Sequence, residues 1–378
     1  MYKSFKIRLY PNKTQEILLE KHIGACRYIW NYMLENQKKL YENGEKTVSA
    51  FNMMALLSKI KKTEEHQWLY DVSNSSCQIV CRDLKKAYDG AFKSQRGFPK
   101  FKSKKRSKPS FPTRPCMVRF KEGRVSLEKI GKVKYKSDLD FLEKNTKKIY
   151  DPRILKCDNK WILSFCVFSD KQAKVLTDKA MGIDLGVKDL AIVAFGEDSL
   201  IFPNINKSQK IKKLNQKLKR LNKKIARKYQ MNKKGNLYIK TKNIEKAEKE
   251  LRRIYSKITN IRNNYLHQVS HKIVELRPYK ITMETLDIQE LLKNKRLSRL
   301  IKEQSFYKFI ELIKYKSEEY GIEFIQAERF FPSSKTCSEC GCIKPDLKLS
   351  DRTYVCKHCG LIINRDLNAA INLMRYKA

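Results

Sequence analysis

The chain has 378 residues, of which 41% are hydrophobic, so it is long enough and apolar enough to form two or three folded domains. Lysine and arginine number 82 against 40 aspartates and glutamates, a formal net charge of +42 that favours a nucleic-acid partner over a membrane surface or a merely basic exterior. No apolar run is long enough to cross a bilayer and residues 1–6 lack a signal-peptide core, so we expect a cytoplasmic protein.

The first half of the chain changes periodicity twice. Residues 5–9 alternate apolar and polar side chains and end at Pro11, which predicts a half-buried strand. The apolar spacing is helical from residue 12 to about 95. It alternates again, as in strands, from residue 119 to 169. We therefore expect a helical bundle inserted after the first strand of a small β-barrel.

The second half has the pattern of an α/β unit. Short apolar runs predict five strands, at residues 181–187, 190–195, 200–202, 279–284 and 322–325. An amphipathic helix that starts near Phe306 lies between the last two. Three strands in hairpin order, followed by strand, helix and strand, are the outline of a ribonuclease-H-like sheet.

A long helical insertion separates the third and fourth of these strands. Apolar residues repeat at three-four spacing in residues 211–225 and again in residues 244–265, on either side of Gly235. This pattern predicts an antiparallel helical hairpin. The remaining face of the first helix is nearly all Lys, Arg, Asn and Gln. A solvated face is the simple interpretation, but a face of one sign of charge favours contact with phosphates.

Four cysteines near the C-terminus have the spacing of a structural zinc site. Cys337 and Cys340 form one Cys-x₂-Cys pair, and Cys356 and Cys359 form a second pair fifteen residues later. A glycine follows each pair, where a tight turn is needed. Cys342 is a spare thiol, and His358 is an alternative ligand. The six other cysteines, which stand singly, are interpreted as small buried hydrophobic residues: Cys26, Cys77, Cys81, Cys116, Cys157 and Cys166.

Three acidic residues stand where an isolated charge is costly. Asp184 lies within an apolar run, Glu284 ends another, and Asp366 opens a helix whose Ala369 and Ala370 allow close packing. Brought together on one sheet, three carboxylates can hold two Mg²⁺ ions about 3.5–4 Å apart. Taken singly, each acid is more often a helix cap or a surface residue.

At this point the sequence resembles the TnpB family, the OrfB-type proteins of bacterial insertion sequences that are related to compact type V CRISPR effectors. The resemblance covers essentially the whole chain. It rests on matches to three RuvC motifs, to the segment that enters a zinc module, and to three N-terminal motifs. These are residues 182–186, 283–286, 364–370, 331–341, 9–15, 27–31 and 97–102.

The resemblance implies an RNA-guided DNA endonuclease. A guide RNA from the transposon end would pair with one strand of a double-stranded target DNA, and the protein would read a short adjacent motif. Asp184, Glu284 and Asp366 take the positions of the catalytic, Mg²⁺-binding acids, and Cys337, Cys340, Cys356 and Cys359 those of the zinc ligands. One site would hydrolyse both strands in turn, in the bacterial cytoplasm and on the nucleoid when bound to DNA.

This resemblance also implies a chain of several domains. A β-barrel domain would comprise residues 1–10 and 106–178, and a helical recognition domain residues 11–105. A RuvC-like nuclease domain would comprise residues 179–336 and 361–378, with its insertion at about 206–275. A zinc ribbon that binds the target nucleic acid would occupy residues 337–360.

Two other functions remain open from the sequence. One is a nuclease-inactive relative that acts as an RNA-guided DNA-binding repressor, against which the presence of all three acids argues. The other is an unguided zinc-ribbon protein that binds nucleic acid during transposition. A discrete copurified RNA would argue against the unguided protein, and Mg²⁺-dependent cleavage would argue against the repressor.

Overall fold

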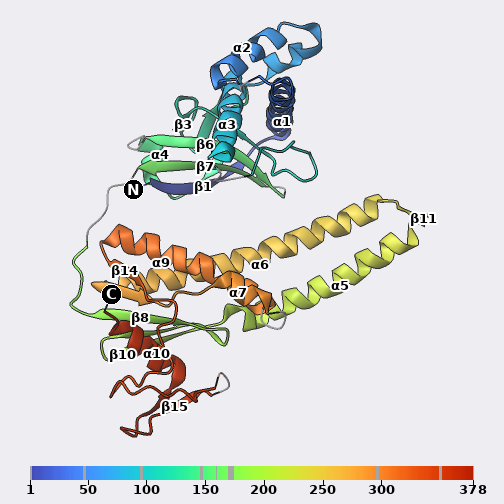
Figure 1. The fold of residues 1–378 in the computed structure, drawn as a ribbon. Coiled ribbons are helices and arrows are strands. Elements are labelled where there is room, and N and C mark those ends of the chain that lie inside the picture. The colour runs from blue at the N-terminus through green and yellow to red at the C-terminus, as the bar shows by residue number, and fades with distance from the viewer. Residues whose placement is uncertain are drawn as a thin grey trace. The chain divides into compact units, whose positions relative to one another are not determined.

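A computed structural model describes residues 2–45, 48–93, 97–144, 148–158, 160–168, 174–294, 298–348 and 351–377. The chain divides into two units, Met1–Asp170 and Lys171–Ala378, and each is described by itself (Figure 1). Among the described residues, no helix combines the length and the apolar character needed to cross a membrane.

An antiparallel seven-stranded sheet forms the base of the first unit. Its strands are β1 (Tyr2–Tyr10), β2 (Ser110–Pro112), β3 (Arg119–Lys121), β4 (Arg124–Leu127), β5 (Gly131–Lys136), β6 (Ile149–Cys157) and β7 (Lys160–Phe168). The spatial order is β2-β6-β7-β1-β5-β4-β3, so the first strand of the chain pairs with β7 and β5, which lie far from it in sequence. A short helix, α4 (Asp140–Lys144), lies between β5 and β6.

The predicted helical block follows β1. It comprises α1 (Lys13–Glu42), α2 (Ala50–Ile60), a 3-10 helix (Glu64–Asp71) and α3 (Asn74–Phe92). Asn12 starts α1 with a capping box, because its side chain accepts from the Gln15 backbone N–H while the Gln15 side chain accepts from the Asn12 backbone N–H. The helices and the sheet share one hydrophobic core.

Two expectations about this unit have different outcomes. The insertion of helices after the first strand is confirmed. Closure of the sheet into a barrel stays a prediction, because among the described residues β2 and β3 stand at the two edges. The expected ends of the helical and β-rich stretches, at Gln95 and Ser169, lie outside the described residues.

The expectation that all six single cysteines are buried is wrong. Cys26, Cys77 and Cys81 are buried, as predicted, whereas Cys157 and Cys166 are only partly covered and Cys116 is exposed. Cys116 lies in a 3-10 helix of three residues, Pro115–Met117, which contains no buried side chain. A single turn at the surface has no second face to place against a core.

The sheet of the second unit has the predicted five strands. These are β8 (Ala180–Leu185), β9 (Asp189–Phe195), β10 (Asp198–Pro203), β13 (Lys280–Met283) and β14 (Glu323–Gln326), in the order β10-β9-β8-β13-β14. The first three pair antiparallel, and β13 pairs parallel with both β8 and β14. Helix α9 (Phe306–Tyr320) connects β13 to β14 after two short helices, α7 (Ile288–Lys293) and α8 (Ser298–Gln304).

The predicted helical hairpin is present between β10 and β13. Helices α5 (Gln209–Met231) and α6 (Lys242–Glu275) run side by side after a 3-10 turn (Ile205–Lys207), and two short strands, β11 (Lys233–Lys234) and β12 (Leu237–Tyr238), form the tip (Figure 1). Leu218, Leu221 and Ile225 of α5 pack against Ile254 and Ile258 of α6. The remaining, basic face of α5 is largely exposed.

Helices cover both faces of the five-stranded sheet. Helices α6 and α9 bury one face, with Met181, Ile183 and Met283 in their common core. The C-terminal helix α10 (Arg365–Met374) packs on the opposite face, against Ile192 and Ala194 of β9 (Figure 1). A two-stranded ribbon of β15 (Thr353–Val355) and β16 (Ile362–Asn364) leads into α10.

The contact between α10 and β8 is a contact between backbones. A Cβ atom added to Gly182 would lie 2.0 Å from the Ala370 carbonyl oxygen and 2.2 Å from the Met374 nitrogen, much closer than non-bonded atoms can approach. Ala370 is fully buried in the same contact. Glycine on the strand and alanine on the helix therefore set how close α10 lies to the sheet.

Gly182→Ala is expected to destabilise the second unit by about 3 kcal/mol or more, because the clash is with backbone atoms that cannot rotate away. The matched control is Gly24→Ala in α1, where an added Cβ meets nothing within 4 Å and alanine favours the helix. Thermal unfolding should show a lower midpoint for the first variant and an equal or higher one for the second. Equal midpoints for Gly182→Ala and wild type would contradict the contact.

Candidate active site and metal centre

The register of the sheet places two of the three predicted acids side by side. Met283 of β13 is paired with Ile183 of β8, so Glu284 and Asp184 follow one residue later on adjacent parallel strands. Alternation along a strand then directs both away from the core that contains Ile183 and Met283, toward the face that α10 covers. The carboxylates of Asp184 and Glu284 thus lie next to each other at one edge of that face.

The third acid comes from the first turn of α10. Asn364 caps this helix, because its side-chain oxygen accepts from the backbone N–H groups of Asp366 (2.9 Å) and Leu367 (3.1 Å). The Asp366 carboxylate is paired with the guanidinium of Arg365 at 3.0 Å and lies 3.7 Å from that of Arg352. Two arginines therefore partly neutralise an acid that stands next to two others.

The pKa of Asp184 responds to the charges of both other acids. Withdrawal from water raises the pKa of Asp184 well above its ordinary value, and the charges of Glu284 and Asp366 raise it further. Withdrawal from water also raises the pKa of Glu284, to about 7, although the Leu185 backbone N–H donates to it. Ionising both Asp184 and Glu284 beside Asp366 is thus unfavourable without added positive charge.

These properties fit a site for hard divalent cations. The carboxylates offer oxygen ligands, and their mutual repulsion is relieved by a cation. Among the described residues, these acids are not one of the groups of three or more whose ligand atoms all lie within 4.8 Å of one another. The three carboxylates are thus too widely spaced for one ion to bind all three without side-chain movement.

Glu284→Gln is expected to stabilise the metal-free protein at pH 8, by about 1–3 kcal/mol. With a pKa near 7 in the folded chain and an ordinary value of 4.5, ionisation of Glu284 costs stability progressively as the pH rises through this interval. Glutamine removes that cost, so the difference between the proteins should disappear near pH 4.5. Unfolding in urea with EDTA at both pH values measures it.

Glu197→Gln, at an exposed turn position, is the control for the loss of one negative charge from a basic chain. If Glu284→Gln were less stable than wild type at pH 8 without metal, this would contradict an energetic cost of ionising Glu284 in the folded chain.

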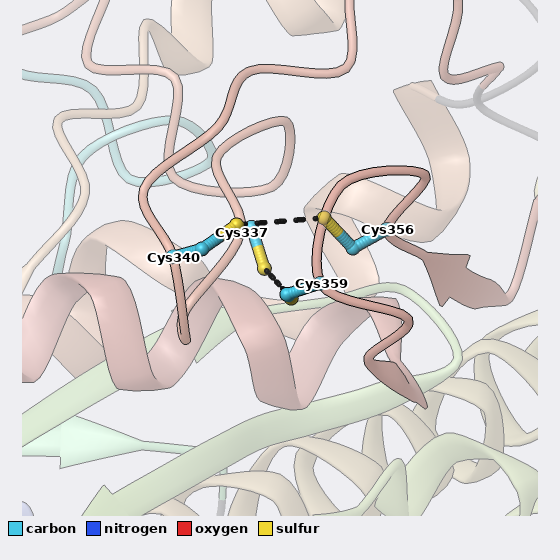
Figure 2. Close-up of side chains that lie close together, drawn as sticks. All are labelled: Cys337, Cys340, Cys356 and Cys359. Carbon is cyan, nitrogen blue, oxygen red and sulfur yellow. Dashed lines mark hydrogen bonds between the residues drawn. The ribbon is translucent and has the colours of Figure 1, made fainter.

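The four predicted zinc ligands also converge. The sulfur atoms of Cys337, Cys340, Cys356 and Cys359 all lie within 4.8 Å of one another (Figure 2). The pairs Cys337–Cys359 and Cys340–Cys356 are each separated by 3.6 Å between sulfurs. A tetrahedral zinc ion with Zn–S bonds of about 2.3 Å requires sulfurs about 3.8 Å apart, so little adjustment is needed.

The backbone around the cysteines has the form of two zinc knuckles. Gly341 and Gly360 adopt positive φ values of 74° and 76°, and their N–H groups donate to the carbonyls of Cys337 and Cys356. Backbone N–H groups of Cys359 and His358 lower the pKa of Cys356 to about 6, which favours the thiolate that binds metal. The donor set and its geometry fit structural zinc.

The cysteine module is fixed to the helix that carries Asp366. Asn368, which is fully buried, accepts from the Ser338 backbone N–H at 2.9 Å and donates to the Thr336 carbonyl at 2.7 Å. One turn later, Asn372 donates to the carbonyls of Ser333 and Thr336, both at 2.7 Å. Hydrogen bonds from two buried asparagine side chains thus attach the Cys337 knuckle to α10. The first of these asparagines lies two residues after Asp366.

Asn368→Ala is expected to weaken the attachment of the knuckle to α10 at a cost of about 2–3 kcal/mol. It leaves the buried Ser338 N–H group without a partner and removes one of the two hydrogen bonds to the Thr336 carbonyl. Faster hydrogen exchange in residues 365–374 and faster loss of zinc to a chelator should follow. Asn222→Ala, at an exposed position of α5, should change neither. An unchanged zinc-release rate in Asn368→Ala would contradict the coupling.

Three family models match separate parts of the chain. Residues 1–46 match a "Helix-turn-helix domain" of the OrfB_IS605 type, and residues 164–295 match the OrfB_IS605 "Probable transposase". Residues 306–373 match a "Cas12f1-like, TNB domain". A Streptomyces pristinaespiralis protein named "Putative RNA-guided DNA endonuclease" is 28% identical, over 98% of this chain and 88% of its own length. TnpB-like protein L79 of Acanthamoeba polyphaga mimivirus is 26% identical, over 98% and 72% respectively.

The chain carries OrfB_IS605-type domains and is similar over nearly its whole length to TnpB-like proteins.

A solved structure supports the fold of this chain. The structure of the mini-RNA-guided endonuclease CRISPR-Cas_phi3 aligns with a TM-score of 0.51 at 12% identity, over 99% of this chain and 92% of that one. At this level of identity the likeness concerns the fold alone.

Two of the N-terminal segments that resemble TnpB motifs contact each other. The indole N–H of Trp30 donates to the Lys100 carbonyl at 3.0 Å, and Asn31 exchanges two hydrogen bonds with the backbone of Lys102. Phe98 and Phe101 remain exposed, as stacking on bases requires. The ammonium group of Lys102 lies 3.5 Å from the centre of the Trp30 ring, as in a cation–π contact.

The sequence interpretation left several residues at these sites without a role. Arg365 and Asn368 lie inside a quoted motif, but nothing in their spacing shows that one neutralises Asp366 and the other holds the zinc knuckle. Arg352 lies outside every motif. The Leu185 N–H that donates to Glu284 depends on the relative placement of two strands and has no signature in sequence.

Proposed function

We propose that this chain is an RNA-guided DNA endonuclease of an insertion sequence. It would use a guide RNA from the transposon end and cleave matching double-stranded DNA next to a short motif by Mg²⁺-dependent hydrolysis. The observation that carries the proposal is the convergence of Asp184, Glu284 and Asp366 from β8, β13 and α10. Relatives named as RNA-guided DNA endonucleases across nearly the whole chain support it.

The three acids would act as ligands of two Mg²⁺ ions. Such a pair supplies Lewis-acid stabilisation to the attacking and leaving oxygens of phosphodiester hydrolysis. Asp184 and Glu284, fixed on adjacent strands, would set the separation of the two positions. Asp366 would exchange its pairing with Arg365 for metal coordination, and the released guanidinium could then face the substrate phosphate.

The fold arrangement supports a RuvC-like, ribonuclease-H-type nuclease domain. We propose its limits as residues 179–336 and 361–378, with the zinc ribbon at 337–360 binding the target nucleic acid. The strand order β10-β9-β8-β13-β14 and the position of α10 support this assignment. A wedge-like β domain (1–10 and 106–178) and a helical recognition domain (11–105) complete the proposal.

The helical hairpin offers a surface for the nucleic-acid backbone. A groove of about 780 Å³ at its base is lined by residues that include Lys219, Lys223, Arg299 and Tyr255. Tyr255 is half exposed, so a base or ribose could stack beside phosphates held by the cations. The groove therefore supports guide-RNA or target-strand contact by this unit.

The direct test is cleavage of a plasmid library with randomised flanks by the protein purified with its own RNA. Mg²⁺-dependent double-strand cuts beside one enriched flank are expected, with loss of cutting in EDTA and a drop of at least about a thousandfold in Asp184→Ala. Asp189→Ala, a neighbouring acid at the start of β9, is the matched control and should cut normally.

Two outcomes would replace the proposal. Retention of the same flank in a pull-down without cutting would indicate the guided repressor. Binding with no discrete copurified RNA would indicate the unguided zinc-ribbon protein.

A further inference from the structure

Two additional metal-binding side chains lie beside the four-cysteine cluster. The sulfurs of Cys340 and Cys342 and a ring nitrogen of His358 all lie within 4.8 Å of one another. Among the described residues, this is the only other group of three or more potential ligands at such spacing. Four thiols already complete a tetrahedral zinc site, so Cys342 and His358 have no role in it.

The two knuckles each present one of these side chains to Cys340. Cys342 directly follows the Gly341 turn, and its carbonyl accepts from the Cys337 N–H at 2.9 Å, which fixes its backbone against the first knuckle. His358 lies between Cys356 and Cys359, and its backbone N–H donates to the Cys356 sulfur. Both placements thus follow from the same hydrogen bonds that shape the knuckles.

The distances allow coordination with small side-chain movements. Zn–S and Zn–N bonds of about 2.3 and 2.0 Å place neighbouring ligand atoms about 3.5–3.8 Å apart, so closure from 4.8 Å needs about 1 Å of movement. Cys342 is partly exposed and His358 is exposed, so both side chains have room to rotate. Thiolate and imidazole donors select soft or borderline ions such as Zn²⁺ over Mg²⁺.

We propose that Cys342 and His358 bind a second Zn²⁺ ion, with the Cys340 sulfur shared between the two ions. The thiolate sulfur of Cys340 has lone pairs for both. The second ion would have three protein ligands and one open position, so it would bind more weakly than the first and exchange with solution. It would also cross-link the two knuckles, because Cys342 belongs to the first and His358 to the second.

The test is native mass spectrometry of the full chain, stripped of metal under reducing conditions and titrated with Zn²⁺ alone. Wild type is expected to take up two ions in sequence, and a weak chelator should remove the second before the first. Cys342→Ser and His358→Gln should each retain only one ion, with unchanged thermal unfolding of the one-ion form. This readout does not depend on nuclease activity.

Matched controls separate this site from other ligands in the chain. Each variant is also titrated in an Asp184→Ala background, so that Zn²⁺ bound at the carboxylates is not counted. Cys116→Ser removes an exposed thiol of the first unit, and His271→Gln removes an exposed histidine that stands one helical turn from His267. Both should keep two ions. One ion at saturation in wild type, two ions in Cys342→Ser, or loss of the second ion in His271→Gln would each overturn the proposal.

Discussion

The close packing of α10 on β8 is the constraint on which the candidate active site depends. Asp184 and Glu284 are brought together by the pairing of two strands, but Asp366 reaches them only because a helix backbone lies directly on a strand backbone at Gly182. Ala370 makes the contact from the helix side. Asp366 lies one helical turn before Ala370, so a small displacement of α10 would move its carboxylate away from the other two.

The same helix connects two centres with opposite electrostatic requirements. Near its N-terminal end, burial and neighbouring negative charges raise the pKa values of Asp184 and Glu284. A bound cation would relieve this unfavourable electrostatic energy. On its flank, Asn368 and Asn372 hold the cysteine knuckle through buried amide hydrogen bonds. Order in the cysteine module therefore stabilises the helix whose first turn carries Asp366.

Periodicity was sufficient for elements whose pattern is local. The α5–α6 hairpin, the strands β8 to β10 and the cysteine knuckles follow from residue spacing, because their partners are close in sequence. The sequence predicted that β1 belongs with the later strands but not that β5 and β7 are its neighbours, since these contacts join residues more than a hundred positions apart. The three acids were linked by motif resemblance alone; their spacing in sequence, 100 residues from Asp184 to Glu284 and 82 to Asp366, contains no geometric information. Arg365 and Asn368 were missed for the same reason.

The central claim is that Asp184, Glu284 and Asp366 form one site for a pair of divalent cations. Anomalous diffraction from crystals soaked in Mn²⁺ tests it most directly. The account predicts two manganese peaks between the three carboxylates, about 3.5–4 Å apart, with the Asp366–Arg365 pairing broken. No peak at these carboxylates, or an Asp366 still paired with Arg365 and no bound ion, would contradict it.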